Sequence, residues 1–285
     1  MIVTRFAPSP TGYLHLGHAF AAIIAHDLAA RGNGRFLLRI EDIDTARARP
    51  KFETAIREDL HWLGLEFEEP VRRQSEHLDD YEAALKKLAA RDLIYPCFCT
   101  RKEIAAEIAR AGSAPHGPDG PIYPGTCRGL LKALREERLA SGASYALRLD
   151  VEKASAAIGR PLSFDEQGLG PEHEQGIQPV QLNLFGDIVV ARKELRTSYH
   201  LAVVVDDALQ GVTLVSRGND LFRASHIQRV LQACLNLEAP AYFHHRLVLD
   251  AEGRKFSKRD VAVTLRSLRE AGETPLSIRT MTGLS

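Results

Sequence analysis

The 285-residue sequence has no long apolar segment and no excess of either charge. It contains no run of about 18 apolar residues, the length that a membrane-spanning helix needs. The N-terminus lacks the charged and then apolar pattern of a secretory signal, so we expect a cytoplasmic protein. Its 37 basic residues balance 37 acidic ones, which argues against strong non-specific binding to nucleic acid but leaves room for a local basic face.

Cysteine is also scarce, and three of the four cysteines lie within 31 residues, at Cys97, Cys99 and Cys127. The segment 111–125 between them is rich in glycine and proline and offers little core of its own. In a reducing cytoplasm, three thiolates suit a structural Zn²⁺ ion better than a disulfide. The spacing does not fix a fourth ligand, for which His116 is the chemical first choice. Three unliganded thiols remain the simpler alternative.

The most informative segment joins a short apolar strand, Ile2–Phe6, to a long amphipathic helix. The residues that follow the strand form a turn and stop any helix before about residue 14: Pro8, Pro10 and Gly12. Apolar residues then recur at helical spacing from His15 to Arg31. His15 and His18 therefore lie in the first turn, where unpaired N–H groups and the helix dipole favour an anion. Gly17, between them, lets a flat base or a ribose approach the backbone.

A second polar segment lies far downstream, at Lys255–Arg259. Lys255, Ser257 and Lys258 place two ammonium groups and a hydroxyl on one loop. Together with the histidine pair, they supply what a protein needs to hold a nucleoside triphosphate at both ends. Neither segment alone is specific, because such a helix start or lysine loop also occurs on ordinary surfaces.

Strands and helices alternate in two parts of the chain, which predicts an α/β fold with a doubly wound parallel sheet. We expect the first part to span residues 1–95, with elements at 2–6, 15–31, 35–41, 50–63 and 75–91. The second part spans 193–260, with elements at 199–209, 213–215, 221–237 and 243–249. Residues 96–192 break this rhythm with the cysteines, a polar helix near 130–139 and short strands at 145–149 and 188–191, so we interpret them as an insertion. Residues 261–285 form a short C-terminal remnant, with elements at 261–270 and 275–285.

The histidine and lysine segments resemble the "HIGH" and "KMSKS" motifs of class I aminoacyl-tRNA synthetases, and the block Arg5–Gly12 is similar to the glutamyl branch. In that family the two motifs bind ATP with Mg²⁺ and stabilise the adenylation transition state. The resemblance implies His15, His18 and Lys258 as catalytic residues, and it adds Gly17, Lys255 and Ser257 to the ATP-binding set. The loop departs from the family pattern at Phe256 and Arg259 but keeps the second lysine.

A glutamate substrate, with one ammonium group and two carboxylates, needs two cationic donors and at least one anion in its pocket. The resemblance implies one set of residues that contact glutamate: Arg5, Phe6, Ala7, Pro8, Ser9, Glu41, Tyr199 and Arg217. The pair Asp206-Asp207 is an alternative carboxylate site with a metal or catalytic role. The stretch 191–196 departs from the Asp-Gly turn that relatives tend to have there, which puts pocket detail near Tyr199 in doubt.

Only 26 residues follow Arg259, too few for an independent anticodon-binding domain. The chain resembles the short paralogues of glutamyl-tRNA synthetases, the glutamyl-Q tRNA(Asp) synthetases, which glutamylate queuosine in the anticodon of tRNA(Asp). This resemblance favours Tyr123 over His116 as the fourth zinc ligand, and we expect a monomer. Three alternatives stay open: a truncated glutamyl-tRNA synthetase that charges tRNA(Glu), a small-molecule nucleotidyltransferase, and a non-catalytic RNA-binding module.

Overall fold

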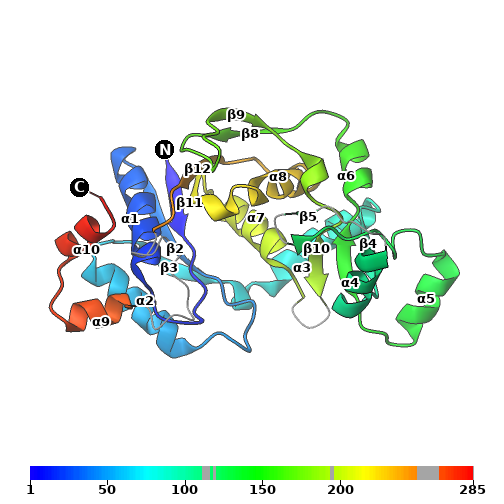
Figure 1. The fold of residues 1–285 in the computed structure, drawn as a ribbon, viewed down its shortest axis with the longest axis horizontal. Coiled ribbons are helices and arrows are strands. Elements are labelled where there is room, and N and C mark those ends of the chain that lie inside the picture. Colours follow the sequence, from blue (N-terminus) through cyan, green and yellow to red (C-terminus); the bar gives the residue numbers. More distant parts are fainter. Residues whose placement is uncertain (111–115, 118–119, 193–195, 249–262, 285) are drawn as a thin grey trace.

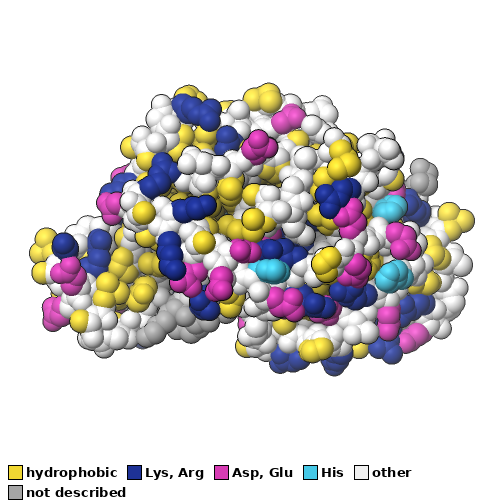
Figure 2. Space-filling model, turned by 180° about the vertical axis from the view of Figure 1, so that it is seen from behind, with side chains coloured by type: hydrophobic (Ala, Val, Ile, Leu, Met, Phe, Trp, Pro, Cys, Tyr) yellow, Lys and Arg dark blue, Asp and Glu magenta, His cyan; other side chains and the backbone are white. Residues whose placement is uncertain are grey.

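The computed structural model describes the chain except for residues 111–115, 118–119, 193–195, 249–262 and 285. In these described parts, the strands form one parallel sheet, one mixed sheet that is parallel except for one edge strand, one antiparallel sheet and a two-stranded ribbon. On the face drawn in Figure 2, basic and acidic side chains are interspersed, in keeping with the balanced composition. No helix among the described residues is both long and apolar enough to cross a membrane.

The N-terminal part is a parallel sheet in the order β3–β2–β1, with its helices beside it (Figure 1). Its elements are β1 (Val3–Phe6), α1 (Leu16–Arg31), β2 (Arg35–Ile40), α2 (Pro50–Trp62) and β3 (Glu68–Arg73). The first four predicted elements are confirmed to within one residue at each end. The core here joins α1 to β2 through side chains such as Ala19, Ile23, Leu38 and Ile40, each no more than 1% exposed. Burying an Ile or Leu fully stabilises the fold by about 1.5–3 kcal/mol.

The second part is a four-stranded sheet in the order β11–β12–β8–β9. Its strands and helices are β8 (Ser163–Glu166), β9 (Gly176–Pro179), α7 (Tyr199–Leu209), β11 (Leu214–Gly218), α8 (Ala224–Leu235) and β12 (Ala241–His245). Strands β11, β12 and β8 run parallel, and β9 is antiparallel to β8. The prediction placed the last strand at 243–249. In the structure this strand, β12, begins two residues earlier, at Ala241, and ends at His245.

The two parts meet at β1 and β11, which lie side by side. Thr213 N donates to Val3 O at 3.0 Å, and Val3 N donates to Thr213 Oγ1 at 2.9 Å. Further along, two residues after Val3 and three after Thr213, Arg5 Nη1 donates to Ser216 O at 3.2 Å. The strands therefore run in the same direction, and their carboxyl ends share one edge. Doubly wound sheets bind ligands at such an edge, where the strand order reverses.

The segment between these parts forms an antiparallel sheet, β10–β7–β4, that carries the cysteines. Its elements are α3 (Leu78–Ala90), β4 (Ile94–Cys97), α4 (Arg101–Arg110), β5 (His116–Gly117), β6 (Gly120–Pro121), α5 (Lys132–Ala140), β7 (Ala146–Leu149), α6 (Val151–Ile158) and β10 (Val189–Arg192). Strands β8 and β9 also fall within 96–192, but β8 pairs with β12 of the second part. The insertion predicted over these residues therefore contains strands of two different sheets.

The C-terminal residues pack against the first part of the chain. They form α9 (Leu265–Glu270) and α10 (Pro275–Met281). Leu265 and Ile278 are fully buried in the core beneath α1 and α2, and Arg279 pairs with Asp27 of α1 through two contacts of 3.0 Å. The element expected at 261–270 begins at Leu265 in the described structure, and residues 261–262 lie outside it.

Candidate active site

The first turn of α1 holds two imidazoles against each other. His15 is the N-cap, and its Nδ1 accepts from Gly17 N at 3.1 Å. The Nδ1 atom of His18 in turn accepts from His15 N at 3.2 Å, and the ring centroids lie 3.8 Å apart. Because each Nδ1 accepts a hydrogen bond, each neutral ring carries its proton on Nε2. The turn thus provides two imidazole N–H donors of fixed tautomer beside a helix N-terminus, where anions bind favourably.

Gly17 makes room for this arrangement. A Cβ atom at this position would lie 3.1 Å from Cε1 and 3.2 Å from Nδ1 of His15. The prediction gave Gly17 the role of admitting a base or ribose. In the structure, the His15 imidazole also occupies the space beside Gly17, which itself lines the neighbouring cavity, so the predicted role of Gly17 stays a prediction.

A cavity of about 260 Å³ opens beside the two histidines. Its lining comes from the start of α1 and from the residues after β11 and β12: His15, Gly17, His18, Phe20, Ala21, Gly218, Asp220, Leu221, His245, Arg246, Leu247 and Val248. The sequence analysis did not assign His245 and Arg246 to this site. The signal was present, because polar residues that end a buried strand are typical of ligand sites in such sheets.

Lys255, Ser257 and Lys258 lie outside the described residues. The described residues on both sides of segment 249–262 reach the histidine turn. Val248 lines the cavity, Thr264 forms a β-bridge with His15, and Leu265 N donates to Leu14 O at 2.8 Å. The chain therefore leaves and re-enters the described structure beside the predicted triphosphate site.

The four charged or phenolic residues predicted to contact glutamate converge at the neighbouring strand ends. Burial raises the pKa of the Tyr199 hydroxyl, with opposing contributions from Arg217 and Arg5 and a further increase from Glu41. These three charges therefore lie near enough to the Tyr199 hydroxyl to act on it electrostatically. Burial also raises the pKa of Glu41, against the lowering effect of Arg39 and Arg5. Cations and a carboxylate thus lie close enough to influence one another, which suits a substrate that carries both charges.

The residues at the end of β1 and in the turn after it differ in what they could offer to a glutamate substrate. Glu41 N donates to Pro8 O at 3.1 Å, which ties the turn to the end of β2. Ala7 is half-buried and Ser9 is exposed. The Phe6 side chain packs in the core under α1, because it points to the opposite side of the strand from Arg5. Only the backbone of Phe6 is left for a contact with glutamate.

Arg217 sits in a dense polar environment. Its Nε donates to His244 Nε2 at 3.1 Å, Nη1 donates to Gln228 Oε1 at 2.8 Å, and Nη2 donates to Ser225 Oγ at 2.6 Å. The side chain is buried, and the guanidinium lies 5.2 Å from the Tyr242 ring centroid. Arg217 is therefore a buried cation and not a solvated surface charge.

Asp206 and Asp207 act as internal counterions. Asp207 Oδ1 accepts from Arg39 at 2.7 Å and from Arg5 at 3.0 Å. Asp206 accepts from Arg72 and Gln74 at 2.8 Å and from the Tyr81 hydroxyl at 3.0 Å. Arginines and polar side chains already occupy these carboxylates, so the alternative of a metal or catalytic site here is not supported.

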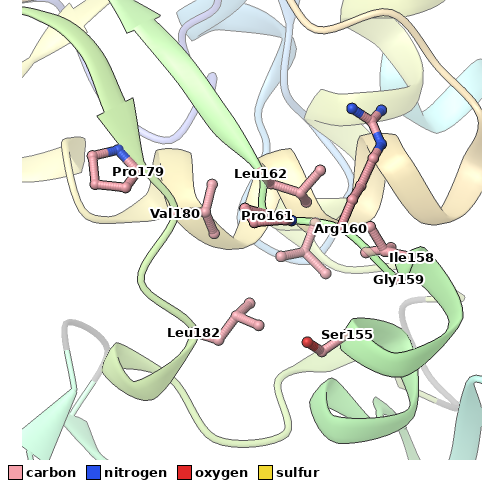
Figure 3. A pocket seen from close by; sticks show the side chains of 10 residues that line it. Ser155, Ile158, Gly159, Arg160, Pro161, Leu162, Pro179, Val180 and Leu182 are labelled. Carbon is pink, nitrogen blue, oxygen red and sulfur yellow. The ribbon is translucent and has the colours of Figure 1, made fainter.

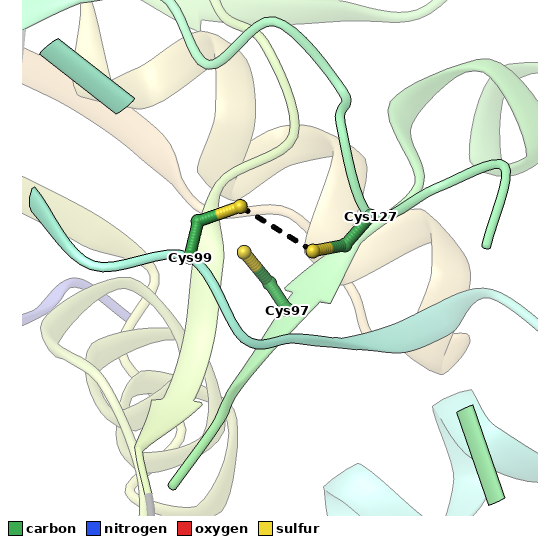
Figure 4. Close-up of side chains that lie close together, drawn as sticks. All are labelled: Cys97, Cys99 and Cys127. Carbon is green, nitrogen blue, oxygen red and sulfur yellow. Dashed lines mark hydrogen bonds between the residues drawn. The ribbon is translucent and has the colours of Figure 1, made fainter. Parts of the chain in front are cut away.

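Three sulfur atoms cluster at the end of β4 (Figure 4). The Sγ atoms of Cys97, Cys99 and Cys127 lie within 4.8 Å of one another. The Tyr123 hydroxyl lies 3.3 Å from Cys97 Sγ and 3.6 Å from Cys99 Sγ. Burial raises the pKa of the Cys99 thiol to about 12, so a thiolate there needs a neighbouring cation. Three sulfurs and an oxygen form a donor set that fits Zn²⁺. His116 lies in β5, and its side chain is not described.

A separate cavity of about 360 Å³ lies between α6 and the β8–β9 pair (Figure 3). Aliphatic side chains such as Leu162, Val180 and Leu182 line it, together with Arg160. None of the predicted site residues contributes to its wall, and we assign no role to it.

Comparison with known proteins gives this arrangement a family. The family described as "tRNA synthetases class I (E and Q), catalytic domain" matches residues 1–284. A solved glutamate tRNA ligase from Elizabethkingia meningosepticum superposes with a TM-score of 0.74 at 29% identity, over 91% of this chain and 52% of that one. The Mycobacterium tuberculosis methionyl-tRNA synthetase, at 12% identity and a TM-score of 0.59, shares the fold alone. The chain therefore has the α/β fold of the class I synthetases, with its parallel sheet, and is a ligase of that class.

Curated relatives narrow the family further. The glutamyl-Q tRNA(Asp) synthetase of Rhodobacter capsulatus is 48% identical over 99% of this chain and 100% of its own length. That of Deinococcus radiodurans is 44% identical over 96% of this chain and 86% of its own. The glutamate–tRNA ligase of Aquifex aeolicus is 37% identical, and the chain spans only 55% of its length. The chain belongs to the family of glutamyl-Q tRNA(Asp) synthetases.

Proposed function

We propose that this protein activates L-glutamate with ATP and transfers the glutamyl group from the adenylate to queuosine in the anticodon of tRNA(Asp). The observation that carries the first step is the convergence of two sites on one sheet edge. The imidazole pair of α1 opens onto one cavity, and Arg5, Glu41, Tyr199 and Arg217 meet at the adjoining strand ends. The acceptor rests on the relatives that match nearly the whole chain, which are glutamyl-Q tRNA(Asp) synthetases.

The proposed chemistry needs no covalent enzyme intermediate. The α-carboxylate of glutamate attacks the α-phosphorus of ATP, and pyrophosphate leaves. Positioning and charge stabilisation are sufficient for such a step. The Nε2–H groups of His15 and His18, with the ammonium of Lys258, would stabilise negative charge on the phosphates. Gly17, Lys255 and Ser257 complete the proposed ATP-binding set, and Mg²⁺ enters with ATP as its complex.

The charges proposed for the amino acid pocket are complementary to those of glutamate. Arg5 and Arg217 are the cations for the glutamate carboxylates, Glu41 is the anion for the ammonium group, and Tyr199 lies between them. The turn residues Ala7, Pro8 and Ser9 and the backbone of Phe6 would form the near wall, since Pro8 is bonded to Glu41. A hydroxyl of the RNA then attacks the carbonyl carbon of the adenylate, which forms the glutamyl ester and releases AMP.

A structural Zn²⁺ ion would be held by Cys97, Cys99, Cys127 and the Tyr123 oxygen. The ion would cross-link the end of β4 to the segment before α5. Such a cross-link would stabilise this region, because α5 has no buried residue to anchor it. We propose that residues 96–192 act as an inserted zinc-containing domain in the family manner, even though β8 and β9 pair with the second part of the sheet. Its role would be contact with tRNA.

Two measurements test the proposal. Glutamate-dependent ATP–pyrophosphate exchange is expected with the wild type and should fall about a hundredfold or more in Lys258→Ala, as when a transition-state donor is removed. Labelled glutamate should then enter queuosine-containing tRNA(Asp) but not tRNA(Glu). Transfer to unmodified tRNA(Glu) alone would identify a truncated glutamyl-tRNA synthetase instead. Absence of exchange with glutamate would indicate instead that the protein activates a different acid or that it is a non-catalytic RNA-binding module.

A further inference from the structure

The guanidinium of Arg217 is supported from behind by a chain of buried groups on three adjacent strands. Arg217 on β11 donates from Nε to His244 Nε2 on β12 at 3.1 Å. His244 Nδ1 lies 2.5 Å from Glu166 Oε2 at the end of β8. The side chains of His244 and Glu166 are both 0% exposed. The strand order β11–β12–β8 brings the three residues into line, and Arg217 and His244 are direct partners in the sheet register.

The hydrogen bonds fix the tautomer of His244. A guanidinium has only donors, so His244 Nε2 must accept from Arg217. The Ser225 hydroxyl, 3.4 Å from the same Nε2, is itself an acceptor for Arg217 Nη2 and can point its proton at the ring. The neutral imidazole then carries its proton on Nδ1 and donates it to Glu166. Burial lowers the pKa of His244 to about 4 against the raising effect of Glu166, so the ring is neutral at neutral pH.

Hydrogen bonds and tight packing fix the orientation of the Glu166 carboxylate. Its Oε1 accepts from the backbone N–H groups of His244 and Gly168, both at 2.9 Å. A Cβ at Gly168 would lie 2.3 Å from His244 O, so the turn after β8 packs tightly on β12. One carboxylate oxygen is thus bound by the backbone, and the other is directed at the imidazole.

We propose that Glu166 and His244 are positioning residues for glutamate: they fix the Arg217 guanidinium so that its remaining N–H donors face a carboxylate of the substrate. This inference rests on the proposed role of Arg217 in binding glutamate. Of the five N–H donors that an arginine carries, His244, Gln228 and Ser225 take three. Two remain, the number that a bidentate contact with a carboxylate uses.

Glu166→Gln tests the tautomer directly. Glutamine has one carbonyl oxygen, and the two backbone N–H groups of His244 and Gly168 hold it in place. Its amide N–H then faces His244 Nδ1, which must become an acceptor. The proton moves to Nε2 and meets the N–H of Arg217, donor against donor. The volume of the side chain barely changes, so the fold is disturbed little while the support of Arg217 is inverted.

The readout is glutamate-dependent ATP–pyrophosphate exchange with the full-length protein. We expect the KM for glutamate to rise about tenfold or more in Glu166→Gln, the effect of one lost hydrogen bond to a charged group, while the KM for ATP stays within about twofold. The matched control is Asp165→Asn on the same strand. Among the described residues, the Asp165 carboxylate accepts a side-chain hydrogen bond only from Gln167 Nε2, at 2.9 Å, so the kinetics of this variant should equal those of the wild type. A folded Glu166→Gln protein with unchanged glutamate KM, or with glutamate and ATP constants that rise together, overturns the inference.

Arg217→Lys separates this result from a failure of the proposed function. A raised glutamate KM in Arg217→Lys beside an unchanged one in Glu166→Gln would reject the support chain alone, whereas an unchanged KM in Arg217→Lys would reject the role of Arg217. The ¹⁵N spectrum of histidine-labelled wild-type protein reports the tautomer of His244, and it tests the proposal even if Glu166→Gln does not fold. We expect wild-type His244 to be protonated on Nδ1 and bare on Nε2, and a wild-type ring protonated on Nε2 instead would overturn the proposal.

Discussion

At the scale of single residues, the site depends on side chains that accept hydrogen bonds as much as on those that donate them. His15 and His18 use one ring nitrogen each to cap α1, which leaves the other nitrogen with its proton. His244 accepts from Arg217 at Nε2 in a similar way, because its ring proton lies on Nδ1, from which it donates to the Glu166 carboxylate. In each case the backbone or a buried acid, and not the substrate, selects the tautomer.

Gly17→Ala should reduce activity without reducing stability. The new methyl group would lie 3.1 Å from His15 Cε1 and push the imidazole from its capping position. Misplacing a catalytic group by a fraction of an ångström to an ångström costs about tenfold to a hundredfold in rate, so we expect kcat for ATP–pyrophosphate exchange to fall by that amount. Alanine favours a helix over glycine by up to about 1 kcal/mol. Loss of the His15 cap costs a similar amount, so the melting temperature should stay close to that of the wild type.

The control for this substitution is Gly129→Ala, because a Cβ at Gly129 meets nothing within 4 Å. This variant should match the wild type in both rate and melting temperature. If Gly17→Ala retains the full rate, the His15 ring has space to yield, and the role of Gly17 returns to the admission of the nucleotide.

At the scale of elements, predictability followed how strongly each segment repeats its apolar pattern. Helix α1 and strands β1 and β2 were predicted to within a residue because their apolar positions recur over a core-facing side. Strand β3, Glu-Glu-Pro-Val-Arg-Arg, was missed because it is a polar edge strand with one buried apolar residue, Val71. Its pairing with β2 is a tertiary choice that local propensity does not contain.

The candidate site divides in the same way. Residues at strand ends with a nearby turn signal, such as Arg5 and Arg217, both act electrostatically on the Tyr199 hydroxyl, and their role in binding glutamate stays a prediction. Glu166 was not found, because it lies in a segment whose pairing with β12 follows only from the folded sheet. Asp207 was noticed as a charge, but its partners Arg5 and Arg39 are more than 160 positions away in sequence. Contacts over such separations leave no local signature.

For the cysteine cluster, Tyr123→Phe distinguishes the two candidate fourth ligands. The Tyr123 oxygen accepts from Cys127 N at 2.8 Å and lies beside two sulfurs. If it completes the donor set, its removal should weaken zinc retention about tenfold or more in a chelator competition followed by mass spectrometry of the metal. Tyr145→Phe, whose ring packs 5.9 Å from Phe98 in the same region, serves as the control. Unchanged retention in Tyr123→Phe together with a loss in His116→Ala would instead make the imidazole the ligand.

The contact between α2 and α9 should make stability depend on pH. Burial raises the pKa of Asp59 to about 6, although Arg269 lies 3.5 Å away. The unfolded chain titrates near the ordinary value of 3.8, so between about pH 4 and pH 6 the folded protein keeps a proton that the unfolded chain has lost. The free energy of unfolding should therefore fall as the pH rises through this window, by about 1–2 kcal/mol after screening is allowed for.

Urea unfolding at pH 4.5 and pH 7, about the two ends of that window, measures this contribution. Asp59→Asn cannot titrate, so its difference in unfolding free energy between the two pH values should be smaller than that of the wild type. Glu58→Gln, the neighbouring exposed acid that also contacts Arg269, should keep the wild-type difference. The same pH dependence in Asp59→Asn and wild type would place the responsible group elsewhere.

At the scale of the whole molecule, one carboxylate connects parts of the chain that are far apart in sequence. Asp207 on α7 accepts from Arg5 on β1 and from Arg39 on β2, and its side chain is 9% exposed. Although burial raises its pKa, the two guanidinium groups lower it below the ordinary value, so the group stays ionised. Arg39 in turn contacts Glu41 at 3.1 Å, and Arg5 contacts the backbone of β11. The ion pairs that join the two sheets therefore include Arg5 and Glu41, two of the residues proposed to bind glutamate.

Asp207→Asn should weaken fold and function together. An asparagine keeps one acceptor but leaves two buried arginines short of a negative charge, and breaking such a buried pair costs about 3–5 kcal/mol. We expect the free energy of unfolding to fall by about 3 kcal/mol, seen as a lower urea midpoint at an unchanged slope. The glutamate KM should rise as well, because Arg5 loses its anchor, while Asp165→Asn should change neither quantity. A stability within about 1 kcal/mol of the wild type would mean that these pairs behave like surface ion pairs, and that backbone hydrogen bonds between Val3 and Thr213 hold the two sheets together.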